Sequence, residues 1–147
     1  MASAMWAFYR GEAYLGTASA VFAALWISYG MLLWLIQRGV VTGETTGDIR
    51  GLLFVAWAVT FSIVWLASIR EHWGLALVTM GATLMFALLS IGTYRESTDW
   101  LKAAGWVGFA TAGLAWYSAL AEMVNSEFKR PVLPTSGEWF RYYLRPG

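Results

Sequence analysis

Hydrophobic residues in this chain gather in four long uncharged runs, and short polar clusters separate these runs. A helix rises about 1.5 Å per residue, so roughly 20 apolar residues suffice to cross the hydrocarbon core of a bilayer. All four runs approach or exceed that length. We therefore predict an all-α fold, a polytopic membrane helical bundle with four transmembrane helices. The expected helices cover residues 13–37, 51–69, 73–94 and 101–124.

The segments outside these helices predict the rest of the organisation. Residues 1–12 form an aromatic stretch that is too short to span a bilayer, so we expect a helix end followed by a turn. Residues 38–50 carry three Gly, three Thr and four charged side chains, which predicts a flexible loop. The transmembrane domain is thus expected at residues 13–125. A cytoplasmic tail follows at residues 126–147, where prolines prevent regular helix.

Small residues recur at spacings of three and four along the last expected helix. They are Gly105, Gly108, Ala112, Ala115 and Ala119. Residues at these spacings share one helix face. In a membrane, a face of small residues allows another helix to approach closely, because packing rather than a hydrophobic drive holds the helices together. We expect this face to pack against a neighbouring helix.

The distribution of Lys and Arg predicts the orientation of the spans. With four spans, both termini lie on the same side, and that side carries Arg10, Arg70, Lys129, Arg130, Arg141 and Arg145. The other side carries Arg38, Arg50, Arg95 and Lys102. Positive charges favour the cytoplasmic side of a membrane. We therefore expect an integral protein of the cell membrane with both termini in the cytoplasm.

Composition supports the membrane assignment and excludes several kinds of site. Hydrophobic residues make up 59% of the chain and charged residues 13%, whereas soluble proteins are about a quarter charged. The net charge of +1 gives no argument for a nucleic-acid partner. Without cysteine, disulfides and thiolate chemistry are excluded, and with the single histidine His72 no zinc site of the usual kind is expected. With no catalytic constellation in the sequence, we expect neither an enzyme nor a cofactor or metal site.

The chemistry that the spans do offer suits passage of a small carboxylic acid. No span contains a buried acid or base, which argues against a proton pump built on buried carboxylates. A weak acid can cross as the neutral molecule, or as an anion drawn past hydroxyls, ring edges and helix N-termini. The candidate hydroxyls belong to Thr17, Tyr29, Thr83 and Tyr117, and Phe22 and Leu84 are the candidates for an apolar constriction.

Aromatic residues line one face of the first expected helix. Phe22, Trp26 and Tyr29 follow one another at spacings of four and three residues, so they lie on the same side. Two interpretations remain open for this face. It lines a pathway across the membrane, or it makes ordinary packing and lipid contacts.

Several segments resemble one known family of membrane proteins. They are Ala104–Gly108, Ala115–Tyr117, Ala121–Glu122, Asn125, Phe128 and Val132–Pro134. Together they are similar to the last helix and tail of the acetate uptake transporter family, the bacterial, archaeal and fungal acetate/succinate permeases. Leu84–Gly92 resembles the fifth of that family's six helices. Thr17, Ala18 and Trp26 agree with its third helix, whereas Phe22 departs from it.

The resemblance implies an architecture, an activity and an assembly. Trp6, Arg10 and Gly11 stand where the family's second helix closes, so the chain is expected to correspond to helices three to six and to lack the first two. The activity implied is uptake of acetate or a related short carboxylate such as succinate, by proton symport or through a channel. The family also forms ring-like homo-oligomers, which implies a hexamer here. Its narrow gate would involve Phe22 and the segment Ala82–Leu84.

A second interpretation remains beside the transporter. A shortened relative could keep the helical bundle yet be unable to move substrate alone, acting instead as an accessory subunit beside longer relatives. The two interpretations differ in one observable property, which is uptake of a labelled short acid by cells that produce this chain.

Overall fold

The computed structural model describes residues 1–43, 45–69, 73–130 and 132–134. His72 and the part of the predicted tail beyond Pro134 lie outside the described residues. The described part is all-helical. Its elements are α1 (Ala2–Tyr9), α2 (Ala13–Gln37), α3 (Thr45–Ser68), α4 (Trp73–Tyr94) and α5 (Thr98–Phe128). The last four are long and apolar enough to cross a membrane, which confirms the prediction of an all-α fold with four spans.

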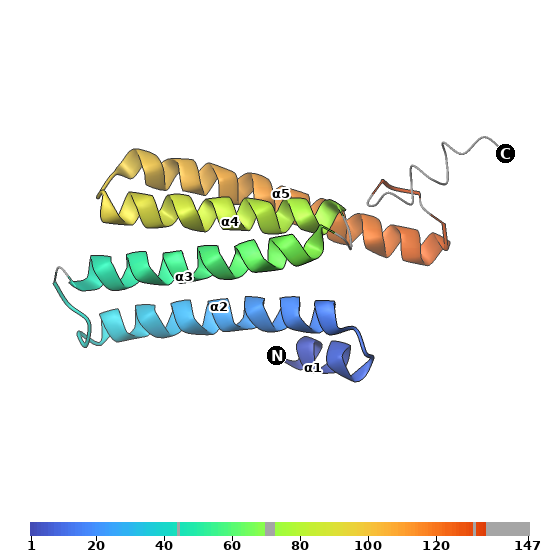
Figure 1. The fold of residues 1–147 in the computed structure, drawn as a ribbon, viewed down its shortest axis with the longest axis horizontal. Helices are drawn as coiled ribbons and strands as arrows, with labels where there is room; N and C mark the ends of the chain where they lie inside the picture. The colour runs from blue at the N-terminus through green and yellow to red at the C-terminus, as the bar shows by residue number, and fades with distance from the viewer. Residues whose placement is uncertain (44, 70–72, 131, 135–147) are drawn as a thin grey trace.

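The long helices run alternately up and down, as their short connections require (Figure 1). Every extensive contact in the described residues joins helices that are adjacent in sequence. In the most apolar stretches of α3 and α4, 33% of the residues are buried, against 11% in α2 and 6% in α5. The predicted bundle is therefore open, with α3 and α4 at its centre and α2 and α5 at its edges.

Helix α3 begins six residues before the predicted start, so the loop predicted at residues 38–50 was wrong for its second half. The helix starts at Thr45, with Asp48 in its first turn. An acidic side chain three residues after a Thr is typical of a helix start, because carboxylates favour the positive end of the helix dipole. Arg50 consequently lies inside α3 rather than in a loop.

The small residues of α5 divide between two surfaces. A methyl group on Gly108 would lie 2.7 Å from Met85 Sδ of α4, whereas open space surrounds Gly105. Ala104 was not among the predicted residues, yet it is fully buried. Ala104, Gly108 and Thr111 follow a spacing of four and three residues, so they share the face that meets α4. The predicted single face was therefore only partly right.

A pair of buried hydroxyls joins α3 to α4. Ser68 Oγ lies 3.0 Å from Thr79 Oγ1, and both side chains are almost fully buried. The hydroxyl that accepts in this pair donates its own proton within its helix, Ser68 to the carbonyl of Trp65 or Thr79 to that of Leu75. Hydrogen bonds between helices stabilise membrane proteins modestly, by about 1 kcal/mol each. Together with the close approach of Gly51 to the Tyr94 ring, this pair makes α3 and α4 the most firmly packed unit.

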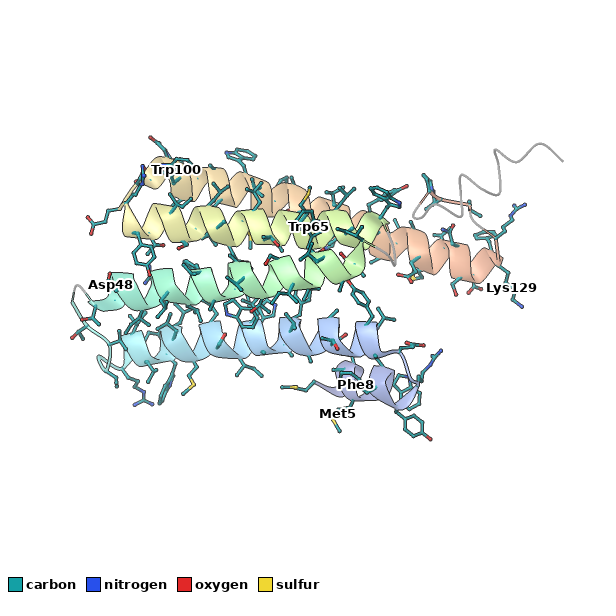
Figure 2. The ribbon with its side chains drawn as sticks, in the orientation of Figure 1. Met5, Phe8, Asp48, Trp65, Trp100 and Lys129 are labelled. Atoms are coloured by element: carbon teal, nitrogen blue, oxygen red, sulfur yellow. The ribbon has the colours of Figure 1, made fainter. Side chains whose placement is uncertain are left out.

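The short helix α1 folds back along the start of α2 (Figures 1 and 2). Its Ala4 and Ala7 are buried, and the Phe8 ring lies against Gly16, where a methyl group would come within 2.7 Å of the ring. Gly11 joins the two helices in a left-handed conformation with φ of 76°. Glycine adopts that conformation without strain, so the chain reverses at this point.

Candidate functional site

The region where α2 faces α3 holds three of the predicted site residues. We call it the α2–α3 seam, formed by residues 13–29 of α2 and residues 50–67 of α3. Thr17, Phe22 and Tyr29 come from α2. A cleft separates α2 from α3 at one end of the seam, and aromatic rings join the two helices in the middle. Arg50 lies at the other end. Each part offers a different chemistry along the membrane normal.

A cleft of about 260 Å³ opens at the end of the seam that lies near the start of α2. Its lining is mostly apolar and consists of Ala13, Tyr14, Thr17, Ala18, Ile63, Val64 and Ala67. The Thr17 hydroxyl donates to the carbonyl of Ala13 at 2.8 Å. A hydroxyl oxygen retains acceptor capacity when its proton is donated. The cleft therefore suits a small, weakly polar molecule with a proton to donate, such as a neutral carboxylic acid.

Aromatic rings fill the middle of the seam. Phe22 meets Phe61 edge to face at a centroid distance of 5.2 Å, and Tyr29 lies 6.2 Å from Phe54. Phe61 is completely buried and also stacks on Phe86 of α4 at 5.5 Å. Such edge-to-face and stacked arrangements are the favourable ones for aromatic pairs. They close this part of the seam with apolar surface.

One polar contact crosses the aromatic section. The indole Nε1–H of Trp57 donates to Ser28 Oγ at 3.2 Å, and the Ser28 hydroxyl in turn donates to the carbonyl of Leu25 at 2.9 Å. The bond links α3 to α2 at the depth where both helices are otherwise apolar. A polar group that is satisfied in this way costs little in a membrane interior.

Arg50 marks the other end of the seam. It lies four residues before Phe54, on the same face of α3, and is half-buried. Asp48 at this end of α3 is labelled in Figure 2. The sequence analysis did not select Arg50 because it placed residues 38–50 in a loop. The Thr-x-x-Asp pattern at Thr45 was the signal that could have moved the helix start and brought this arginine to the seam.

The remaining predicted site residues take no part in the contact between α2 and α3. Trp26 is 67% exposed and Leu84 is 50% exposed, so the structure does not pack Leu84 into the aromatic cluster with Phe22 and Phe61. The Thr83 hydroxyl donates to the carbonyl of Thr79, within α4. The structure thus assembles the α2 part of the predicted pathway against α3, and leaves its α4 residues on other surfaces.

Tyr117, the last predicted residue, is bonded to the chain that follows α5. Its hydroxyl donates to the carbonyl of Pro134 at 3.2 Å. The Asn125 amide donates to the carbonyl of Leu133 at 2.9 Å and accepts from the Leu133 amide at 2.8 Å. Ala121 lies between Tyr117 and Asn125 on the same helix face and is fully buried. Residues 132–134 therefore form a strap that runs back along α5.

Replacing Asn125 by alanine is expected to loosen this strap, because the substitution removes a donor and an acceptor together. Each lost hydrogen bond costs about 1 kcal/mol, so hydrogen exchange at the Leu133 amide should accelerate by on the order of tenfold or more. Exchange measured by mass spectrometry checks this. Asn125→Asp keeps the acceptor for the Leu133 amide and should show a smaller effect. Equal exchange in all three proteins would contradict the role of the side chain.

Comparison with known protein families identifies the family of this chain. The model of the GPR1/FUN34/yaaH family matches residues 1–136. The chain belongs to the GPR1/FUN34/yaaH family. The resemblance to acetate transporters that the sequence suggested is thereby confirmed at the level of the family. That the chain lacks the first two of the family's six helices stays a prediction.

Named members of the GPR1/FUN34/yaaH family include transporters. The chain is 26% identical over 125 residues to the succinate-acetate/proton symporter SatP of Escherichia coli (strain K12), covering 85% of this chain and 66% of SatP. It is 28% identical over 122 residues to ammonia transport outward protein 3 of Saccharomyces cerevisiae, covering 80% of this chain and 44% of that protein. Acetate permease A of Emericella nidulans is 26% identical over 148 residues, with 90% and 49% covered. The chain thus spans between 44% and 66% of the length of these relatives.

The fold is also similar to a solved structure. The bacterial acetate channel SatP superposes with a TM-score of 0.82 at 25% sequence identity, covering 90% of this chain and 73% of the channel. A likeness of that extent means that the open arrangement of α2 to α5 has a counterpart within a known membrane channel. These members of the family are transporters or channels rather than enzymes.

Proposed function

We propose that this protein carries short carboxylic acids, acetate or succinate, across the cell membrane. The observation that carries the proposal is the structural likeness to the bacterial acetate channel SatP over 90% of the chain. The α2–α3 seam supports it with a chemistry suited to weak acids. Homo-oligomers and a cytoplasmic location for both termini stay predictions, as does the part played by Trp26, Thr83, Leu84 and Tyr117.

The apolar middle of the seam favours the protonated form of the substrate. An ionised carboxylate that enters an apolar region without a partner loses its hydration at a cost of many kcal/mol, whereas the neutral acid loses far less. Residues 51–69 and the whole of α2 carry no charge that could pair with the anion there. A substrate that crosses as the neutral acid brings one proton with each of its carboxyl groups, so uptake would be proton-linked without any titrating side chain within the span.

The residues of the seam would then act in sequence. In the uptake direction the acid would exchange hydrogen bonds with Ser28 between the rings, and its O–H would then donate to the Thr17 hydroxyl in the cleft. Phe22 and Phe61 exclude water from the narrow part, which keeps ions from following the acid. Hydroxyl contacts and an apolar constriction of this kind are the usual elements of selectivity in a narrow pore.

Uptake of labelled acetate by cells that lack their own permease tests the proposal. Cells producing this chain should accumulate acetate faster than cells with an empty vector, and more so at mildly acidic pH, where more of the substrate is neutral. Membrane fractions must contain the protein in both pH conditions. No uptake from a chain that is present in the membrane would overturn the proposal and favour the interpretation as a relative that does not transport alone.

Replacing Phe22 by alanine is expected to widen the constriction, because the ring contributes the α2 side of its contact with Phe61. Uptake of acetate should rise, and larger acids that the original protein excludes should begin to enter. Uptake assays with a series of acids of increasing chain length measure the change. Ile27→Ala is the matched control, since Ile27 is 58% exposed on the same helix. An unchanged size limit in Phe22→Ala would remove this ring from the pathway.

A further inference from the structure

We propose that Arg50 captures the carboxylate of the transported acid at the end of the α2–α3 seam. This inference rests on the proposed function and names a binding residue within it. The observation behind it is a single unsatisfied donor. Nε of Arg50 is buried and has no hydrogen-bond partner among the residues that the structure describes.

The position of Arg50 is set by the helix that carries it. Arg50, Phe54, Trp57 and Phe61 recur at spacings of four, three and four residues, so they form one stripe along α3. Phe54 and Phe61 are buried in the aromatic cluster, and Trp57 bonds Ser28 of α2. Arg50 therefore stands at the end of the stripe that lines the seam.

The backbone beside Arg50 is fixed against α4. Gly51 is buried, and a methyl group there would lie 2.7 Å from the Tyr94 ring. The carbonyl of Gly51 also accepts a hydrogen bond from Ser90 at 3.4 Å. Because its neighbour is held this closely, Arg50 can move through its side-chain rotamers but not through the helix that carries it.

No ion pair joins Arg50 to another charged group in the part of the chain that the structure describes. Asp48 is exposed and lies two residues away, which places it on the opposite side of α3. Arg38 has a partner of its own, since its guanidinium lies 5.2 Å from the centre of the Trp34 ring. In the described residues the recorded ion pair is Arg10 with Glu12, at the opposite end of α2. Among the residues that the structure describes, Arg50 thus keeps an Nε–H donor without an acceptor.

A buried donor without an acceptor is unfavourable, and more so on a charged group. Buried polar groups in native proteins are almost always hydrogen-bonded, so each exception asks for an explanation such as a ligand. Arg50 as a whole is only half-buried, so part of the residue reaches the protein surface although its Nε is buried. A small rotamer change can therefore bring the guanidinium to a ligand at the surface.

The chemistry of that ligand follows from the shape of the guanidinium. Its planar N–H donors match the two oxygens of a carboxylate through two parallel hydrogen bonds. The acid would arrive as an anion, bind at Arg50, and on leaving the guanidinium take up a proton from hydronium in the surrounding water before it enters the aromatic section. A lipid phosphate offers similar oxygens, so the experiment must separate the two sources.

Thermal unfolding of the purified protein in detergent, with and without sodium acetate, tests this assignment. Acetate should raise the Tm of the original protein, because a ligand that binds only the folded state stabilises it. Arg50→Gln should need at least about tenfold more acetate for the same shift, since a charge-assisted bidentate contact is lost. Arg95→Gln is the control, because it removes the same charge from an exposed site at the same end of the molecule.

Each outcome decides the assignment. An equal acetate shift in the original protein and Arg50→Gln, or no shift in either, overturns it. A shift with phosphatidylglycerol but not with acetate, lost in Arg50→Gln, also overturns it and assigns Arg50 to lipid phosphate. Arg50→Lys keeps the charge without the planar donors, so it should lie between the two and can replace a glutamine variant that does not fold. The unfolding measurement does not depend on transport. A failure of acetate uptake would therefore contradict the proposed function without deciding whether Arg50 binds acetate.

Discussion

Replacing Phe61 by alanine is expected to lower the free energy of unfolding by about 2 to 3 kcal/mol, the largest effect of any single truncation in the seam. Phe61 is completely buried and its ring contacts Phe22, Trp57 and Phe86, so three helices meet on it. In soluble cores a Phe→Ala change costs about 3–5 kcal/mol. The lower figure applies because lipid is as apolar as the protein interior, which leaves lost packing as the main term.

Unfolding in mixed micelles of mild detergent and dodecyl sulfate measures this change. Ile63→Ala is the control, since Ile63 lies two residues away on the same helix and is 63% exposed. It should change the unfolding midpoint little. If both substitutions reduced stability equally, the aromatic cluster would not be the packing centre that its geometry indicates. Acetate uptake by Phe61→Ala should also lose selectivity, because the same ring closes the seam.

Replacing Gly81 by alanine is expected to push α4 and α5 apart. A methyl group at Gly81 would overlap the side chain of Thr111 on α5, whose branched Cβ has few alternative rotamers. Overpacking of this kind costs about 1–3 kcal/mol in a well-packed interior. The free energy of unfolding should fall by more than that amount, because among the described helices α5 packs extensively against α4 alone.

The same unfolding assay checks the second prediction, and two further variants make it specific. Gly105→Ala should be neutral, since nothing lies within 4 Å of the position that the methyl group would occupy. The double variant with Thr111→Ala should recover part of the loss, because the alanine removes the atoms that the new methyl group meets. Additive losses in the double variant would show that Thr111 is not the obstacle.

The two predictions concern two different helix contacts, that of α2 with α3 and that of α4 with α5. The contact of α4 with α5 is close and depends on the absence of side-chain atoms, as at Gly81 and Gly108. The contact of α2 with α3 is looser and depends on large rings, and it leaves a cleft of about 260 Å³ at one end. A loosely packed interface is easier to open. This difference is one reason to place the substrate pathway at the α2–α3 seam.

Hydropathy alone was sufficient to predict the class of protein and the four spans. In a membrane the length of an uncharged run is dictated by the thickness of the bilayer, so local composition determines where a span lies. The bounds of α2 and α4 coincide with the predicted ranges for that reason. The start of α3 differs from the predicted start. A helix can extend past the apolar run into a polar segment that carries its own start signal, and here that signal lies at Thr45 and Asp48.

The sequence could not show which face of each span meets which neighbour. A soluble helix reveals its buried face by hydrophobic periodicity, but a span is apolar on every side, and its outward and inward faces look alike. Phe22 and Trp26 were predicted together, yet one meets Phe61 and the other is 67% exposed. Tyr117 was predicted as a candidate hydroxyl of the pathway, and the structure shows that it donates to the carbonyl of Pro134 in the strap.

The sequence by itself therefore determined the membrane class, the number of spans and the resemblance to acetate transporters, since each depends on residues close together in the chain. Only the tertiary structure decided the seam, the buried position of Phe61, and the place of Arg50 at the end of the aromatic stripe. Those features depend on contacts between residues far apart in sequence. Packing of whole helices selects such contacts, and no local pattern in an apolar span encodes them.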